Sequence, residues 1–215
     1  IRTFAGFDPL RDAEERATLP DYATRSHFAR YRRYWHDRAG SGPRIHGLKL
    51  YPPMGFRPIA NEQSMFAGRD RALGTIRRRW AALGLPFDEL AARLNRSLED
   101  LYAFCSEHDV PLLGHARHSN EAGRCLGVQA GPIGWLDVLS RFSNLRICLG
   151  HFAEAKDFEL GMRRWDEPQR VPPRVWALHG IDRLLAMNAA GPSRVYADLG
   201  DMSEFLWSAL LARGR

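Results

Sequence analysis

The chain contains two short apolar runs that each end in a histidine. The first spans Pro111 to Gly114 and is followed by His115, and the second spans Leu145 to Gly150 and is followed by His151. Short apolar runs of this kind are typical of buried parallel strands. A helix-like segment that opens with Pro132 separates them. The pattern therefore predicts two neighbouring strands whose carboxyl ends deliver both imidazoles to one edge of a parallel sheet.

The remaining segments extend this pattern into alternating strands and helices. We predict further strands at residues 1–7, 45–51 and 195–199. Helical periodicity covers the segments at about 11–38, 69–83, 87–105, 132–139, 175–187 and 203–212. Residues 97–100 (SLED) would instead begin a separate helix if they form a capping box. Residues 54–67 are predicted to form a long loop, which in a compact domain is commonly a lid or a binding loop.

Five strands that alternate with helices predict an α/β fold with right-handed crossovers. A Rossmann-type sheet is disfavoured, because the first strand is followed by DPLRDA and not by a glycine-rich turn. At 215 residues the chain is also shorter than a complete (β/α)8 barrel of about 250 residues. We therefore predict a single domain over residues 1–215 that forms an incomplete TIM barrel.

Two kinds of side chain at the predicted edge could carry chemistry. Neutral imidazole binds zinc and titrates near neutral pH, which suits His115 and His151, although each could instead be a structural hydrogen-bonding residue. Lys49 is one of only two lysines and lies near the end of the 45–51 strand. Its ammonium group needs a carboxylate, a bound anion or a modified nitrogen there, unless it reaches the solvent at the rim or pairs with a structural acid.

Four further residues are candidates for binding a substrate. Asp198 ends the last predicted strand, where it could equally be a turn or N-cap residue. Arg57, Arg117 and His118 follow strands in loops and could bind a substrate carboxylate, although surface positions explain them as well.

Composition narrows the function classes. The net charge of +6 comes almost entirely from scattered arginines, and no nucleic-acid-binding motif accompanies them, so solvated arginine-rich helix faces are favoured over a nucleic-acid partner. No run approaches the roughly 18 apolar residues of a membrane span. The three cysteines are odd in number and lack metal-type spacing, which favours a reduced, cytoplasmic setting.

Five segments together resemble the amidohydrolase-related metal-dependent hydrolase family that includes aminocarboxymuconate-semialdehyde decarboxylase. They are AGFDP at 5–9, GLKLYPPMGFRP at 47–58, VPLLGHARHSN at 110–120, NLRICLGHFA at 144–153 and RVYADLG at 194–200. They run in the family's order, cover most of the chain and resemble strands three to seven of its barrel.

The resemblance implies a divalent metal, commonly zinc, at the carboxyl-terminal rim. It implies that His115 is a metal ligand and that His151 is either a second ligand or a catalytic acid and base. Lys49 matches the family's strand-four lysine and is a second catalytic candidate. The expected reaction is hydrolysis of a C–N, ester or lactone bond, or decarboxylation of a carboxylated small molecule. The substrate-binding candidates remain Arg57, Arg117, His118 and Asp198.

The chain also departs from the family pattern. The His-x-His pair of strand one is absent, and the strand-eight aspartate would lie beyond Arg215. Either the chain is an internal portion of a complete enzyme, which we favour, or the protein has lost its metal site. The alternative function is a non-catalytic barrel relative that binds a small ligand or a protein partner without metal. We expect no nucleic-acid or membrane partner and leave a homodimer open.

Overall fold

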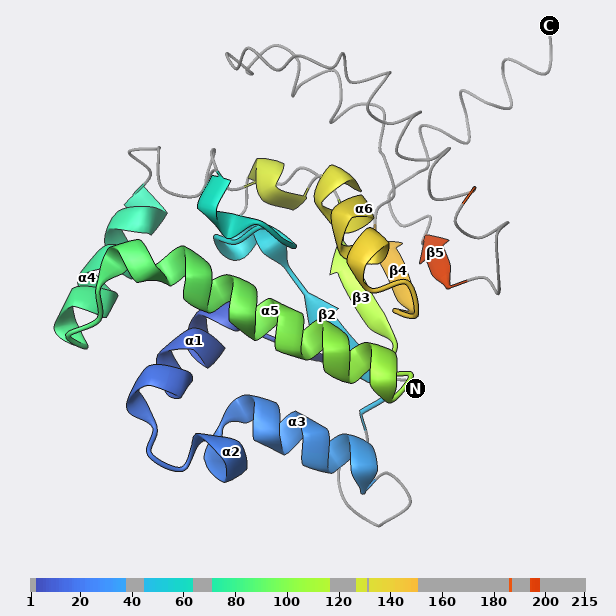
Figure 1. Cartoon of the computed structure of the whole chain (residues 1–215), viewed down its shortest axis with the longest axis horizontal. Helices are drawn as coiled ribbons and strands as arrows, with labels where there is room; N and C mark the ends of the chain where they lie inside the picture. The colour runs from blue at the N-terminus through green and yellow to red at the C-terminus, as the bar shows by residue number, and fades with distance from the viewer. Residues whose placement is uncertain are drawn as a thin grey trace, which may run out of the picture.

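The computed structural model describes residues 3–37, 45–63, 71–116, 127–130, 132–150, 186 and 194–197. Within them, five strands form one sheet: β1 (Phe4–Gly6), β2 (Gly47–Leu50), β3 (Leu112–His115), β4 (Ile147–Gly150) and β5 (Val195–Ala197). Every pair is parallel, and the order in the sheet, β1-β2-β3-β4-β5, is the order in the sequence. The predicted parallel α/β fold is confirmed. In this part of the chain the sheet is not closed (Figure 1).

Six α-helices are described, and they lie between consecutive strands. The connection from β1 to β2 holds α1 (Pro9–Thr18), α2 (Tyr22–Arg25) and α3 (His27–His36). The connection from β2 to β3 holds α4 (Arg71–Ala82) and α5 (Leu90–Glu107), and α6 (Pro132–Arg141) links β3 to β4. In Figure 1, α5 and α6 lie in front of the strands. The helices predicted at 175–187 and 203–212 fall outside the described residues, apart from residue 186.

The helical stretch predicted at about 11–38 consists of three separate helices. Asp8 caps α1 by accepting hydrogen bonds from the backbone amides of Leu10 and Arg11 at 3.0 and 3.2 Å. Ser26 caps α3 by accepting from the amide of Ala29 at 3.0 Å. Because serine and aspartate side chains satisfy the free amides of a first turn, each of these residues starts a new helix.

The region around residues 97–100 does not begin a separate helix, because α5 is continuous through it. Ser97 lies fully buried in the middle of α5 and donates a hydrogen bond to Asp12 of α1 at 2.6 Å. Asp12 is also fully buried and accepts from Arg16 and Tyr22 at 2.7 and 2.8 Å. A buried carboxylate with three donors fixes α1 against α5.

The two faces of the sheet differ in how far they are covered. Leu48, Leu112 and Ile147 are paired across β2, β3 and β4 and are almost fully buried, because the helices pack on this face. The next residue along each strand points to the other face. That row contains Lys49, which is exposed, and Tyr196, which is 49% exposed. We refer to this second side of the sheet as the open face.

The first part of the predicted loop at 54–67 is packed against the helices. It runs from one short 3-10 turn, η1 (Pro52–Met54), into a second, η2 (Asn61–Gln63), and buries Phe56 and Ile59 between them. The buried hydroxyl of Tyr102 on α5 donates to the carbonyl of Pro58 at 2.7 Å. Up to residue 63, the segment therefore has the contacts of a fixed connection and not those of an open lid. Among the described helices, none is long and apolar enough to cross a bilayer.

Candidate functional site

The carboxyl ends of the three central strands meet at one rim of the sheet. Leu50 at the end of β2 pairs with Gly114, and His115 at the end of β3 pairs with Gly150, the last residue of β4. The amide of Ala116 also donates to the carbonyl of Gly150 at 3.1 Å. Parallel α/β folds place their ligand and active sites at this rim.

Three side chains gather on the open face next to this rim. Lys49 pairs with Leu113, and strand alternation puts His115 on the same side of the sheet two residues later. The rings of Tyr51 and His115 have their centroids 4.5 Å apart, and the ammonium nitrogen of Lys49 lies 5.9 Å from the centroid of the Tyr51 ring. We call these three residues the rim trio. It contains two of the predicted site residues and adds Tyr51, which the sequence analysis missed.

The rim trio combines a buried imidazole with an accessible positive charge. The His115 side chain belongs to a residue that is only 6% exposed, whereas Lys49 is exposed. Among the ion pairs of the described residues none involves Lys49, and its ammonium group lies over the face of the Tyr51 ring. An exposed ammonium over an aromatic ring can still bind an anionic group from solution.

The backbone that carries His115 is fixed from the helix side. The indole nitrogen of Trp135 on α6 donates to the carbonyl of His115 at 3.3 Å, and Trp135 is fully buried. The preceding residue must be glycine for this packing, since a Cβ at Gly114 would lie 2.6 Å from Cζ2 of Trp135. The backbone at His115 is therefore held by a tightly packed contact behind the sheet.

Arg57 lies on the segment that leaves β2, and the structure fixes its backbone. Its amide donates to Oδ1 of Asn61 at 2.7 Å, and its carbonyl accepts from Nδ2 of Asn61 at 3.1 Å. Asn61 is itself buried and hydrogen bonded to Asn95 of α5 at 2.8 Å. The described contacts do not join the Arg57 side chain to the rim trio, so its substrate-binding role stays a prediction.

The other predicted site residues lie outside the described part of the chain. These are Arg117, His118, His151 and Asp198. In sequence, His151 directly follows the end of β4, and Asp198 directly follows the end of β5. Within the described ranges, no group of three or more His, Cys, Asp or Glu side chains could hold a metal ion, and His115 is the one predicted ligand that they contain.

No family model, curated protein or solved structure matches this chain. The resemblance carried by its five segments therefore stays a prediction.

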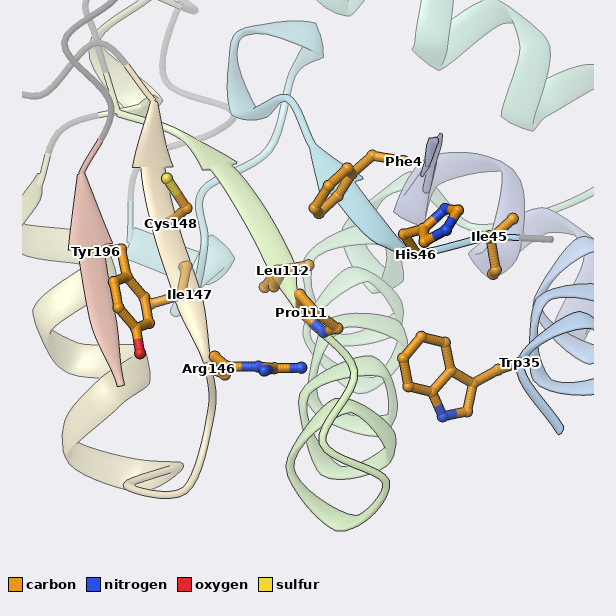
Figure 2. Close-up of a pocket in the computed structure, with 10 residues that line it drawn as sticks. All are labelled: Phe4, Trp35, Ile45, His46, Pro111, Leu112, Arg146, Ile147, Cys148 and Tyr196. Carbon is orange, nitrogen blue, oxygen red and sulfur yellow. The ribbon is translucent and has the colours of Figure 1, made fainter. Parts of the chain in front are cut away.

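A hollow lies at the amino-terminal end of the strands, opposite the rim trio (Figure 2). Its volume is about 620 Å³, and its walls include Phe4, His46 and Tyr196. Arg146, just before β4, projects into it in Figure 2. The sequence analysis did not anticipate this hollow, because its residues come from the starts of several strands and from the segments before them and share no motif.

The charge of Arg146 is used to join loops. Its guanidinium donates to the carbonyl of Asp109 at 2.8 Å and lies 3.3 Å from the carboxylate of the same residue. Arg194, before β5, approaches that carboxylate at 2.9 Å. Asp109 thus ties together the entries to β3, β4 and β5, as expected at the end of the sheet where parallel α/β folds place stabilising contacts.

Proposed function

We propose that this chain belongs to a metal-dependent hydrolase or decarboxylase of the amidohydrolase type. The observation that carries the proposal is the rim trio, in which Lys49, Tyr51 and His115 share one face at the carboxyl ends of consecutive parallel strands. An imidazole beside a cationic group suits a site that binds a metal and an anionic substrate.

The strand order supports a barrel as the parent architecture. A doubly wound sheet reverses its strand order at a switch point, whereas a TIM barrel adds each strand beside the previous one. The order β1-β2-β3-β4-β5 contains no reversal. We assign the five strands to strands three to seven of an eight-stranded barrel, and the open face to its interior.

The metal-binding part of the proposal rests on His115. A buried imidazole at the carboxyl rim, with its backbone fixed by Trp135, fits the position of a zinc ligand. The remaining ligands would come from residues beyond those described. When bound, such an ion supplies a Lewis acid that polarises a carbonyl or carboxylate and lowers the pKa of water to about 7.

The other residues act on the substrate. Lys49 would bind a substrate carboxylate through its exposed ammonium group, and the Tyr51 ring would keep that group beside His115. His151 would accept and return a proton at the attacked centre. The loop residues Arg57, Arg117 and His118, together with Asp198, would complete the contacts to the substrate. This set accommodates hydrolysis of a C–N, ester or lactone bond and decarboxylation alike.

One observation favours a second candidate, a barrel relative that binds an anionic ligand without metal. Among the described residues, His115 belongs to no group of three or more side chains that could hold a metal, whereas the exposed Lys49 ammonium suits a carboxylate by itself. Both candidates place the ligand at the rim trio. They differ in whether His115 holds a metal.

Metal analysis of the complete gene product separates the two. We would measure zinc and manganese content for the wild type, for His115→Ala and for His36→Ala, a control that removes an exposed histidine of α3. The enzyme proposal expects near-stoichiometric metal in the wild type and the control and its loss in His115→Ala. A folded wild type that stays metal-free after zinc and manganese are supplied would refute it and leave the ligand-binding candidate.

A further inference from the structure

A hollow lined by arginines lies among the first three helices, on residues that neither the rim nor the open face uses. Its volume is about 480 Å³. Arg11 and Glu15 reach it from α1, Arg25 from α2, and Arg30 and Arg33 from α3. We call it the arginine hollow. None of these residues belongs to the predicted site.

Helix geometry brings the arginines together. Ser26 ends α2 and caps α3, so the chain changes direction between Arg25 and Arg30. Arg30 and Arg33 are three residues apart on α3, a spacing that places them on the same face of the helix. Like charges at this spacing on a helix repel each other, and a bound anion would relieve that repulsion.

The charges in the hollow are only partly matched. Arg11 is paired with Oε1 of Glu15 at 2.8 Å, and Oε2 of Glu15 accepts from the backbone amide and the imidazole of His27, each at 2.8 Å. Both oxygens of the single carboxylate that lines the hollow are therefore already paired. Arg25 lies 3.8 Å from Asp21, with both side chains largely exposed.

Arg30 and Arg33 carry the unmatched charge. Among the described residues neither has an acidic partner, and the guanidinium of Arg33 lies 5.8 Å from the centroid of the Tyr34 ring. A concave surface lined by one sign of charge concentrates the field and attracts ions of the opposite sign. Guanidinium groups also offer planar pairs of donors that match the oxygens of a phosphate.

We propose that the arginine hollow binds a small molecule that carries a phosphate or polyphosphate group, held chiefly by Arg30 and Arg33 with Arg25 beside them. A small ligand fits better than a nucleic acid, because the hollow is confined to the first three helices and the turns between them. A nucleic acid would need a longer basic track with several phosphate contacts. This binding is independent of the function proposed for the rim.

The test is calorimetric titration of the intact protein with inorganic phosphate and with tripolyphosphate at physiological ionic strength. Saturable one-to-one binding of tripolyphosphate is expected. Arg30→Gln and Arg33→Gln should each weaken it about tenfold or more, since each removes charge-assisted hydrogen bonds. Arg96→Gln, an exposed arginine of α5 that does not line the hollow, is the matched control and should leave affinity unchanged.

A conservative variant sharpens the test. Arg33→Lys keeps the charge and removes the planar fork, so its affinity should fall between those of the wild type and Arg33→Gln. Circular dichroism checks that each variant is folded. If Arg30→Gln does not fold, the test rests on the variants of Arg33, whose side chain is exposed. No saturable binding, or an equal loss in Arg96→Gln, would overturn the proposal. So would tighter binding of an oligonucleotide whose affinity falls steeply with salt over several phosphates.

Discussion

The contact between Gly114 and Trp135 yields a prediction whose size can be worked out from the structure. A Cβ at position 114 would lie 2.6, 2.9 and 3.0 Å from three atoms of the fully buried indole ring. Ordinary contacts to Cβ atoms begin at 3.4 Å, so the ring or the strand must move by several tenths of an ångström. Overpacking of a core in this way costs about 1–3 kcal/mol.

Gly114→Ala should therefore lower the free energy of unfolding by about 2 kcal/mol. With a urea m-value of about 1–3 kcal/mol per molar, the unfolding midpoint should fall by about 1 M. The matched control is Gly6→Ala in β1, where a Cβ meets nothing within 4 Å, and its midpoint should stay the same or rise slightly. Urea titrations followed by circular dichroism measure both.

A second substitution tests the cause. Phenylalanine lacks the outer ring atoms Cζ2 and Cη2 that crowd position 114. In a Trp135→Phe background, Gly114→Ala should cost much less than in the wild type, even though Trp135→Phe itself loses packing and the hydrogen bond to His115. An equal cost of Gly114→Ala in both backgrounds, or no cost in the wild type, would refute the account of how α6 holds the rim.

Three further outcomes are expected. Asp12→Ala should lower the free energy of unfolding by about 3–5 kcal/mol, because it removes a buried carboxylate and leaves its donors without an acceptor. Ser97→Ala removes only one hydrogen bond to that carboxylate and should lower it by about 1.5–3 kcal/mol. Urea titrations that give equal losses for the two variants would contradict this ranking. Burial alone would raise the pKa of Glu15, but hydrogen bonds from His27 and an arginine outweigh it and hold the pKa below 4.5. The wild type should be more stable than Glu15→Gln, by a difference that is complete above pH 4.5 and shrinks as the pH falls below it. Urea unfolding midpoints of both proteins, measured above and below pH 4.5, test this, and a difference that does not change with pH would contradict it. Burial raises the pKa of the Cys105 thiol, so iodoacetamide should label it only after unfolding, and mass spectrometry that finds rapid labelling of the native protein would show otherwise.

The strands and their alignment could be predicted because each is a local apolar run with a clear end. The run at 145–150 becomes β4, which starts at Ile147 because the amide of Leu145 donates to Phe142 and closes the turn after α6. The proximity of Lys49 and His115 followed from the same reasoning, since parallel strands that end together bring their last side chains together. The same reasoning could have identified Tyr51, because it lies two residues after Lys49 and therefore on the same face of the sheet.

The contacts that fix the helices could not be predicted from the sequence. Ser97 and Asp12 are 85 positions apart, and Asn61 and Asn95 are 34 positions apart. Polar residues at such separations show no local pattern, because the pairing exists only after the helices have packed. The capping-box pattern at 97–100 could suggest that Ser97 began a helix, but α5 continues through Ser97, whose hydroxyl meets the buried carboxylate of Asp12.

The order of the strands has a consequence for how the protein is made. Each described strand after β1 pairs with the strand that precedes it in the chain. When a new strand leaves the ribosome, the strand that it pairs with has therefore already been synthesised. The sheet can grow in one direction, strand by strand, with each connecting helix covering the newest addition. Among the described strands, none has to be inserted between two that were made earlier, so the edge that accepts the next strand moves from β1 to β5 as the chain is made.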